Sequence, residues 1–262
     1  MGSREILAWY LDAGVDEAIA EAPVDRLRTA AEPTPPAAIP TTPTAPPPRP
    51  APSPGLALDN PEAAAAGAAA LAAAAQDLDA LKAALSRFDD CPLKWTASNL
   101  VFGDGARDAA VMFVGEAPGA DEDRQGLPFV GVSGRLLDQM MASIGLDRGC
   151  AYITNILPWR PPGNRKPTPA ETTMCLPFIH RHIALLRPKL LVFLGGTASA
   201  TLLNRREGIT KLRGQWLDYE YDGVLIPAMP TYHPAFLLRS SALKRDAWSD
   251  FLAIKLRLAQ AG

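Results

Sequence analysis

The sequence is poor in cysteine and has no long hydrophobic run. The three cysteines are Cys91, Cys150 and Cys175, and no two of them form a CxxC pair. An odd number without such a pair argues against a disulfide framework and against a four-cysteine metal site. No run of 18 uncharged apolar residues occurs, and acidic residues are scattered through the first 20 positions. These features argue against a membrane span and a signal peptide, so we expect a cytoplasmic protein that does not contact membranes.

The small net charge of the whole chain hides two parts of opposite charge, because basic residues are few in the first part and outnumber acidic residues in the second. The net charge is −2, but residues 1–90 hold 13 acids and 6 bases, whereas residues 91–262 hold 15 acids and 20 bases. The second part is therefore cationic and can attract a polyanion. A solvated surface explains the same excess equally well, so charge alone does not identify nucleic acid as a partner.

Composition divides the chain into four segments. Proline occupies 11 of the 22 positions from 33 to 54, which excludes a regular helix or sheet there because proline lacks an amide donor. Apolar spacing before and after that stretch favours helices. The predicted segments are a short N-terminal helical segment at 1–30, a Pro-rich linker at 31–58, an Ala-rich helix at 59–90 and a single domain at 91–262. We expect a monomer, with residues 1–30 available to a protein partner.

The predicted domain alternates short apolar strands with helices. Strands are expected at 109–114, 151–154, 190–194 and 224–229, and helices at 133–144, 169–186, 197–203 and 245–258. This alternation predicts an α/β fold, a three-layer α/β/α sandwich around a mostly parallel sheet. Glycine-rich or polar segments follow the strands, and in such a sheet they gather at the carboxyl edge, where ligands bind.

Several of these segments together resemble one family. The motifs are Val114-Gly-Glu-Ala-Pro-Gly119, Glu122 to Gly131, Ser133-Gly-Arg-Leu-Leu137, Tyr152-Ile-Thr-Asn155, Arg160 to Arg165 and His233-Pro-Ala-Phe-Leu-Leu-Arg239. In order and spacing they are similar to the family 4 uracil-DNA glycosylases, and the resemblance runs from Cys91 to the end of the chain. It implies hydrolysis of uracil from DNA during base excision repair, which leaves an abasic site and requires the base to be flipped into a pocket.

The resemblance implies roles for the residues of that pocket. Phe129 would stack on the uracil ring, and the carboxamide of Asn155 would accept from N3–H and donate to O4, a pattern that cytosine reverses. His233 would stabilise the negative charge that develops at uracil O2. Gly115 and Ala117 would line the pocket.

The group that activates water is not defined by the motifs. Family 1 enzymes carry an aspartate where this chain has Ala117. Glu116 is expected to line the pocket and help hold water, and Glu122 to crowd the C5 edge of the base and exclude thymine. Asn164 is a further catalytic candidate. A carboxylate in a surface turn is the alternative reading of both glutamates.

Other residues are candidates for binding DNA. Ser133 and Gly134 begin a helix, whose N-terminus can bind phosphate, and three arginines lie in the motif loops. Two adjacent leucines would fill the gap left by the flipped base, although core packing explains one of them almost as well. The expected DNA-binding residues are Ser133, Gly134, Arg160, Arg165, Leu237, Leu238 and Arg239.

The cysteines depart from the family pattern. Family 4 enzymes usually hold a four-iron cluster with a CxxC pair and two later cysteines. Cys91 and Cys175 fit the second and fourth positions, whereas Phe88 and Trp159 stand at the first and third. Two thiolates do not satisfy a cluster with four cysteine ligands. The chain thus resembles a branch without the cluster, and we expect no metal and no organic cofactor.

Three alternatives remain open at this stage. The domain could read uracil or abasic DNA without catalysis, since the aspartate is absent at Ala117. It could be a degenerate scaffold whose N-terminal segment recruits a partner. It could also act on another base, such as hypoxanthine or mismatched thymine.

Overall fold

The computed structural model describes residues 61–261, so segments 1–30 and 31–58 lie outside it. The helices are α2 Pro61–Ala74, α3 Leu78–Arg87, α4 Leu93–Thr96, α5 Ala120–Gln125, α6 Val132–Ser143, α7 Pro169–Leu186, α8 Gly196–Leu202, α9 Ile209–Leu212, α10 Pro234–Arg239 and α11 Lys244–Ala261. The strands are β1 Asp104–Gly105, β2 Val111–Gly115, β3 Ala151–Asn155, β4 Leu190–Leu194, β5 Leu217–Tyr221 and β6 Val224–Thr231. None of the helices in this range is long and apolar enough to cross a membrane.

The six strands form one sheet in the order β1-β3-β2-β4-β6-β5. The four middle strands are parallel, and β1 and β5 pair antiparallel to their neighbours at the two edges. The predicted α/β class and the four parallel strands are confirmed. The two edge strands were not predicted, because β1 has two residues and β5 is largely exposed, so neither carries a buried apolar run.

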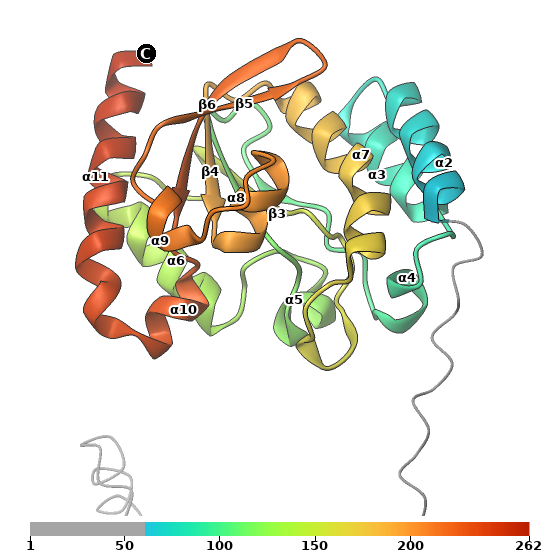
Figure 1. The fold of residues 1–262 in the computed structure, drawn as a ribbon, viewed down its shortest axis with the longest axis horizontal. Helices are drawn as coiled ribbons and strands as arrows, with labels where there is room; N and C mark the ends of the chain where they lie inside the picture. The colour runs from blue at the N-terminus through green and yellow to red at the C-terminus, as the bar shows by residue number, and fades with distance from the viewer. Residues whose placement is uncertain (1–60, 262) are drawn as a thin grey trace, which may run out of the picture. The chain divides into compact units, whose positions relative to one another are not determined.

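Helices cover both faces of the sheet, with α6 and α11 on one side and α7 on the other (Figure 1). Alternate residues of each strand point to opposite faces. Met112, Val114 and Phe193 belong to the core cluster shared with α7, whereas Val111, Phe113 and Val192 belong to the cluster shared with α6 and α11. This alternation buries every residue of β2, β3 and β4.

The Ala-rich segment is two helices, not the single helix expected over 59–90. Helix α2 ends at Ala74, and Asp77 caps α3 by accepting a hydrogen bond from the amide of Ala80. Both helices lie beside α7 (Figure 1), and buried alanines such as Ala68 and Ala72 join the core that contains α7. Residues 61–90 therefore belong to the same compact unit as the rest of the described chain.

Candidate active site

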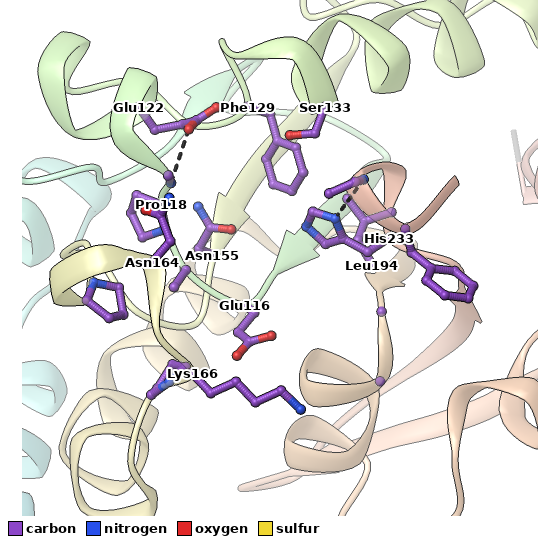
Figure 2. Close-up of a pocket in the computed structure, with 18 of the residues that line it drawn as sticks. Glu116, Pro118, Glu122, Phe129, Ser133, Asn155, Asn164, Lys166, Leu194 and His233 are labelled. Atoms are coloured by element: carbon purple, nitrogen blue, oxygen red, sulfur yellow. Dashed lines mark hydrogen bonds between the residues drawn. The ribbon is translucent and has the colours of Figure 1, made fainter. Parts of the chain in front are cut away.

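A cavity of about 470 Å³ opens at the carboxyl edge of the parallel strands. Strands β2, β3, β4 and β6 end at or just before Gly115, Asn155, Leu194 and Thr231. The loops that follow these strands supply most of the lining, as expected for an open α/β sheet. The predicted residues that line it are Glu116, Ala117, Glu122, Phe129, Ser133, Asn155, Asn164, Arg165, His233 and Arg239 (Figure 2).

Asn155 contributes a buried carboxamide to the lining of this cavity. Its side-chain oxygen Oδ1 is buried and has no hydrogen-bond partner, the one such side-chain atom within residues 61–261. Unpaired buried acceptors are costly in proteins, so an atom of this kind in a cavity indicates a ligand donor. Gly115 lies directly across from Asn155 in the register of β2 and β3.

Phe129 forms one wall of the cavity and faces the side on which His233 lies (Figure 2). The residue is 4% exposed, and the centroid of its ring lies 5.5 Å from that of the His233 ring. Its backbone has φ 54°, in the left-handed region that side chains rarely adopt. The loop between α5 and α6 thus holds an aromatic face beside Asn155.

His233 is the N-cap of α10 and is neutral at physiological pH. Burial, together with the positive charge of Arg239, lowers the pKa of His233 to about 4. Its Nδ1 accepts a hydrogen bond of 3.1 Å from the amide of Ala235, drawn in Figure 2. A neutral imidazole that accepts at Nδ1 carries its proton on Nε2, which leaves Nε2–H as the donor available to a ligand.

A buried network supports the strand that leads to His233. Thr231, at the end of β6, donates a 2.7 Å hydrogen bond to Asp250 of α11, and Arg213 pairs with the same carboxylate. The guanidinium of Arg213 also lies over the ring of Tyr232, 5.4 Å from its centroid. Asp250 of α11 and Arg213, the C-cap of α9, therefore fix the backbone immediately before His233.

The two glutamates differ in their surroundings. Glu122 accepts hydrogen bonds from the amides of Gly119, Val130 and Gly131 at 2.9–3.1 Å, so both of its oxygens are occupied by backbone donors. Glu116 extends its carboxylate into the cavity (Figure 2). Glu116 thus has the free carboxylate of the pair, whereas Glu122 ties two loops of the cavity wall together.

The loop after Arg160 is held by its own side chains. Arg160 donates a 2.7 Å hydrogen bond to Oδ1 of Asn164, and Arg165 forms a bidentate ion pair with Glu171 at 2.6 and 2.9 Å. Glu171 in turn caps α7 through Thr168. Asn164 and Arg165 line the cavity, whereas Arg160 does not, and all three already have protein partners.

The predicted DNA-binding residues do not all have the expected surroundings. Leu237 is 1% exposed and packs in the core, which corrects its assignment as a residue that fills the DNA gap. Leu238 is 44% exposed and remains the candidate. Gly134 is buried, and a Cβ there would lie 1.8 Å from the carbonyl oxygen of Phe129, so this glycine allows α6 to approach the Phe129 loop.

Sequence reasoning missed several residues of the cavity. Lys166 follows the ion-paired Arg165, and its side chain extends past the carboxylate of Glu116 (Figure 2). Lys166 could have been identified from the sequence, because it directly follows Asn164 and Arg165, which were predicted site residues. The pair Gly195-Gly196, which follows β4, was expected at this edge of the sheet, but no role in the site was assigned to it. The further lining residues to which the sequence analysis assigned no role are Pro118, Gly119, Pro161, Pro167, Leu194, Gly196, Ala235 and Phe236.

The positions expected for cluster ligands in the family form an apolar packing site. Cys91 and Cys175 are fully buried, and the hydrogen bond with Cys91, together with burial, raises the pKa of the Cys175 thiol well above its ordinary value. Phe88 and Trp159 are 1% and 2% exposed. Cys150 is exposed, and within residues 61–261 no three His, Cys, Asp or Glu side chains group as metal ligands. These residues do not fit a four-iron cluster.

Comparison with known proteins agrees with this fold and cavity. The family model described as "Uracil DNA glycosylase superfamily" matches residues 102–252, more than half of the chain. This protein therefore belongs to the uracil DNA glycosylase superfamily.

Several similar proteins are type-4 uracil-DNA glycosylases. The type-4 uracil-DNA glycosylase of Archaeoglobus fulgidus is 39% identical over 183 residues, which cover 68% of this chain and 92% of that protein. The type-4 enzyme of Thermotoga maritima is 38% identical over 175 residues, covering 66% and 90%. The type-4 enzyme of Pyrobaculum aerophilum is 38% identical over 178 residues, covering 66% and 91%. The expected resemblance to this family is confirmed.

Proposed function

We propose that this protein hydrolyses the N-glycosidic bond of uracil in DNA and leaves an abasic site. The observation that carries the proposal is the unpaired Oδ1 of Asn155, buried at the back of a cavity that also contains Phe129 and His233. A flipped uracil would present its N3–H donor to that acceptor. Cytosine has an acceptor at the same position and would leave both groups unpaired, at a cost of about 1–3 kcal/mol each.

Bond cleavage then follows from the cavity's own groups. The C1′–N1 bond breaks, its electron pair stays on uracil N1, and the resulting charge is shared with O2. The Nε2–H of neutral His233 donates to O2 and stabilises that charge without giving up its proton. A water held by Glu116 attacks C1′, and its proton passes to solvent or to the leaving base. Base stacking on Phe129 keeps the ring oriented throughout.

The remaining residues support binding. Ser133 and Arg239, which line the cavity, would bind the phosphates beside a flipped nucleotide, and the exposed Leu238 would enter the emptied stack. Four further points stay predictions. They are crowding of the C5 edge of the base by Glu122, a monomeric state, a cytoplasmic location and recruitment of a protein partner through residues 1–30.

The direct test is release of free uracil from a single-uracil oligonucleotide, followed by alkaline cleavage at the abasic site. Matched oligonucleotides with cytosine or thymine at the same position are the controls. Wild-type protein should give one cleaved strand from the uracil substrate only. Tight binding of the uracil oligonucleotide without release would favour the alternative function, a non-catalytic reader, which the alanine at position 117 leaves open.

A further inference from the structure

Phe129 depends on a backbone conformation that its own sequence does not favour. Its φ of 54° lies in the left-handed region, where an aromatic side chain is uncommon. The loop that carries it, between α5 and α6, is short and irregular. Some contact outside the loop must therefore hold this conformation, because the position of the ring follows from it.

Arg148 makes that contact from the loop between α6 and β3. Its Nη1 donates to the carbonyl oxygen of Pro128 at 3.1 Å, and its Nη2 donates to that of Phe129 at 2.5 Å. The same guanidinium pairs with Asp104 of β1 at 2.7 Å and with Asp138 of α6 at 3.0 Å. A planar, five-donor guanidinium can satisfy these four acceptors at once, which a lysine cannot.

The other side of the Phe129 peptide unit is fixed by Glu122. Its carboxylate accepts from the amides of Val130 and Gly131, both at 2.9 Å. The carbonyls before and at Phe129 are thus held by a cation, and the amides after it by an anion. Gly134 closes the remaining side, since its backbone lies against the Phe129 carbonyl.

Arg148 does not itself line the cavity. Its side chain is 26% exposed, and two carboxylates balance its charge, so its surroundings are those of an internal brace, not a free phosphate-binding cation. We propose that Arg148 is a positioning residue that sets the plane of the Phe129 ring against the flipped base. The proposal rests on the proposed function and deepens it.

A double-mutant cycle separates this role from a general effect on folding. Arg148→Gln and Arg148→Lys are measured with and without Phe129→Leu, in the full chain, by single-turnover excision at saturating enzyme. Arg181→Gln is the matched control, because Arg181 also donates two hydrogen bonds to a backbone carbonyl, that of Ala75, and neither residue lines the cavity. Affinity for an abasic duplex is measured in parallel.

We expect each Arg148 variant to slow excision by about 10- to 100-fold, as a small misplacement of a positioning group does. In the Phe129→Leu background the same substitution should cost less than about 3-fold, since no aromatic ring remains to misplace. Abasic-DNA affinity and the Arg181→Gln rate should stay near wild type. An equal loss in both backgrounds, or no loss at all, would overturn the proposal.

Amide hydrogen exchange tests the brace without any substrate. Exchange at residues 126–131 should be faster in Arg148→Gln, or in Arg148→Lys if the glutamine variant fails to fold, but not in Arg181→Gln. Unchanged exchange would contradict the brace. Failure of the wild-type chain to release uracil would contradict the proposed function instead, and the exchange result would still decide the role of Arg148.

Discussion

Gly115 and Asn155 face each other across β2 and β3, and no side chain fits between them. A Cβ on residue 115 would lie 2.4 Å from Asn155 Oδ1 and 2.7 Å from Cζ of Phe129. We therefore expect Gly115→Ala to slow excision by about 100-fold, because it displaces both the Asn155 carboxamide and the Phe129 ring. Gly67→Ala is the control, since its Cβ would have room in α2. A wild-type rate for Gly115→Ala in single-turnover assays would contradict this geometry.

Asn155→Asp should keep the fold but lose discrimination against cytosine. A protonated aspartate can donate to N3 of cytosine, while its other oxygen accepts from the exocyclic amine. The measurement compares excision from uracil and cytosine oligonucleotides by the variant and the wild type. If the variant cuts uracil at the wild-type rate and leaves cytosine intact, Asn155 does not read the base.

His233→Ala should slow excision by roughly 10²–10³-fold, the usual loss when one donor to a developing anion is removed. DNA affinity should barely change. Since the pKa of His233 is lowered to about 4, the ring is already neutral above pH 5, so the wild-type rate should not fall where an ordinary histidine titrates. A wild-type excision rate in the His233→Ala variant would remove this residue from the mechanism. A wild-type rate that halves near pH 6.5 would contradict the lowered pKa of His233.

The three histidines should make the fold sensitive to mild acid. Burial lowers the pKa of His180 and His233 to about 4 and that of His182 to about 3, whereas the unfolded chain takes up these protons near pH 6.5. The contribution of the neutral histidines to the free energy of unfolding is therefore fully present above pH 6.5 and is lost as the pH falls toward 4. Each should lower the free energy of unfolding by about 1.4 kcal/mol per pH unit within that window.

Urea unfolding at pH 7 and pH 5 measures this loss. His180→Gln serves as the matched variant. It removes one of the three histidines that take up a proton on unfolding, while Tyr219 keeps a polar neighbour. Its stability should fall less between the two pH values than that of the wild type. Equal losses would show that groups other than the histidines carry the pH dependence.

Trp159→Ala should lower the free energy of unfolding by about 3–5 kcal/mol, as truncation of a buried aromatic side chain does. Trp95, 62% exposed, provides the control Trp95→Ala, which should have a small effect.

Purified wild-type protein should be colourless, with iron well below one atom per chain, because Phe88 and Trp159 supply no sulfur ligand. A brown protein with stoichiometric iron and sulfide would overturn this expectation.

Much of the fold could be predicted because its signals are local. The helix 169–186 and the strand 190–194 were predicted at their observed bounds, since a capping threonine, a first-turn proline and a buried apolar run mark them. The division of the Ala-rich segment at Asp77 was missed, because alanine continues a helix without preference for where it ends. The edge strands depend on pairing partners far along the chain.

The candidate site shows the same division. Asn155, Phe129 and His233 could be found from motifs, and they do meet in one cavity. The pairing of Arg165 with Glu171 and the burial of Leu237 could not be predicted, because both are set by packing between segments. The hydrogen bonds of Arg148 are also invisible in sequence, since an arginine in a loop has no pattern that indicates backbone carbonyls as partners.

The hydrogen bond between Thr231 and Asp250 determines how much of the chain must be synthesised before the site can form. His233 follows almost all of the domain along the chain, and the carboxylate that anchors its strand comes later still, in α11. A growing chain that ends after β4 lacks the later lining residues, among them His233 and Arg239, as well as the carboxylate of Asp250. Incomplete chains should therefore be unable to excise bases, and activity should arise only once the last helix has docked.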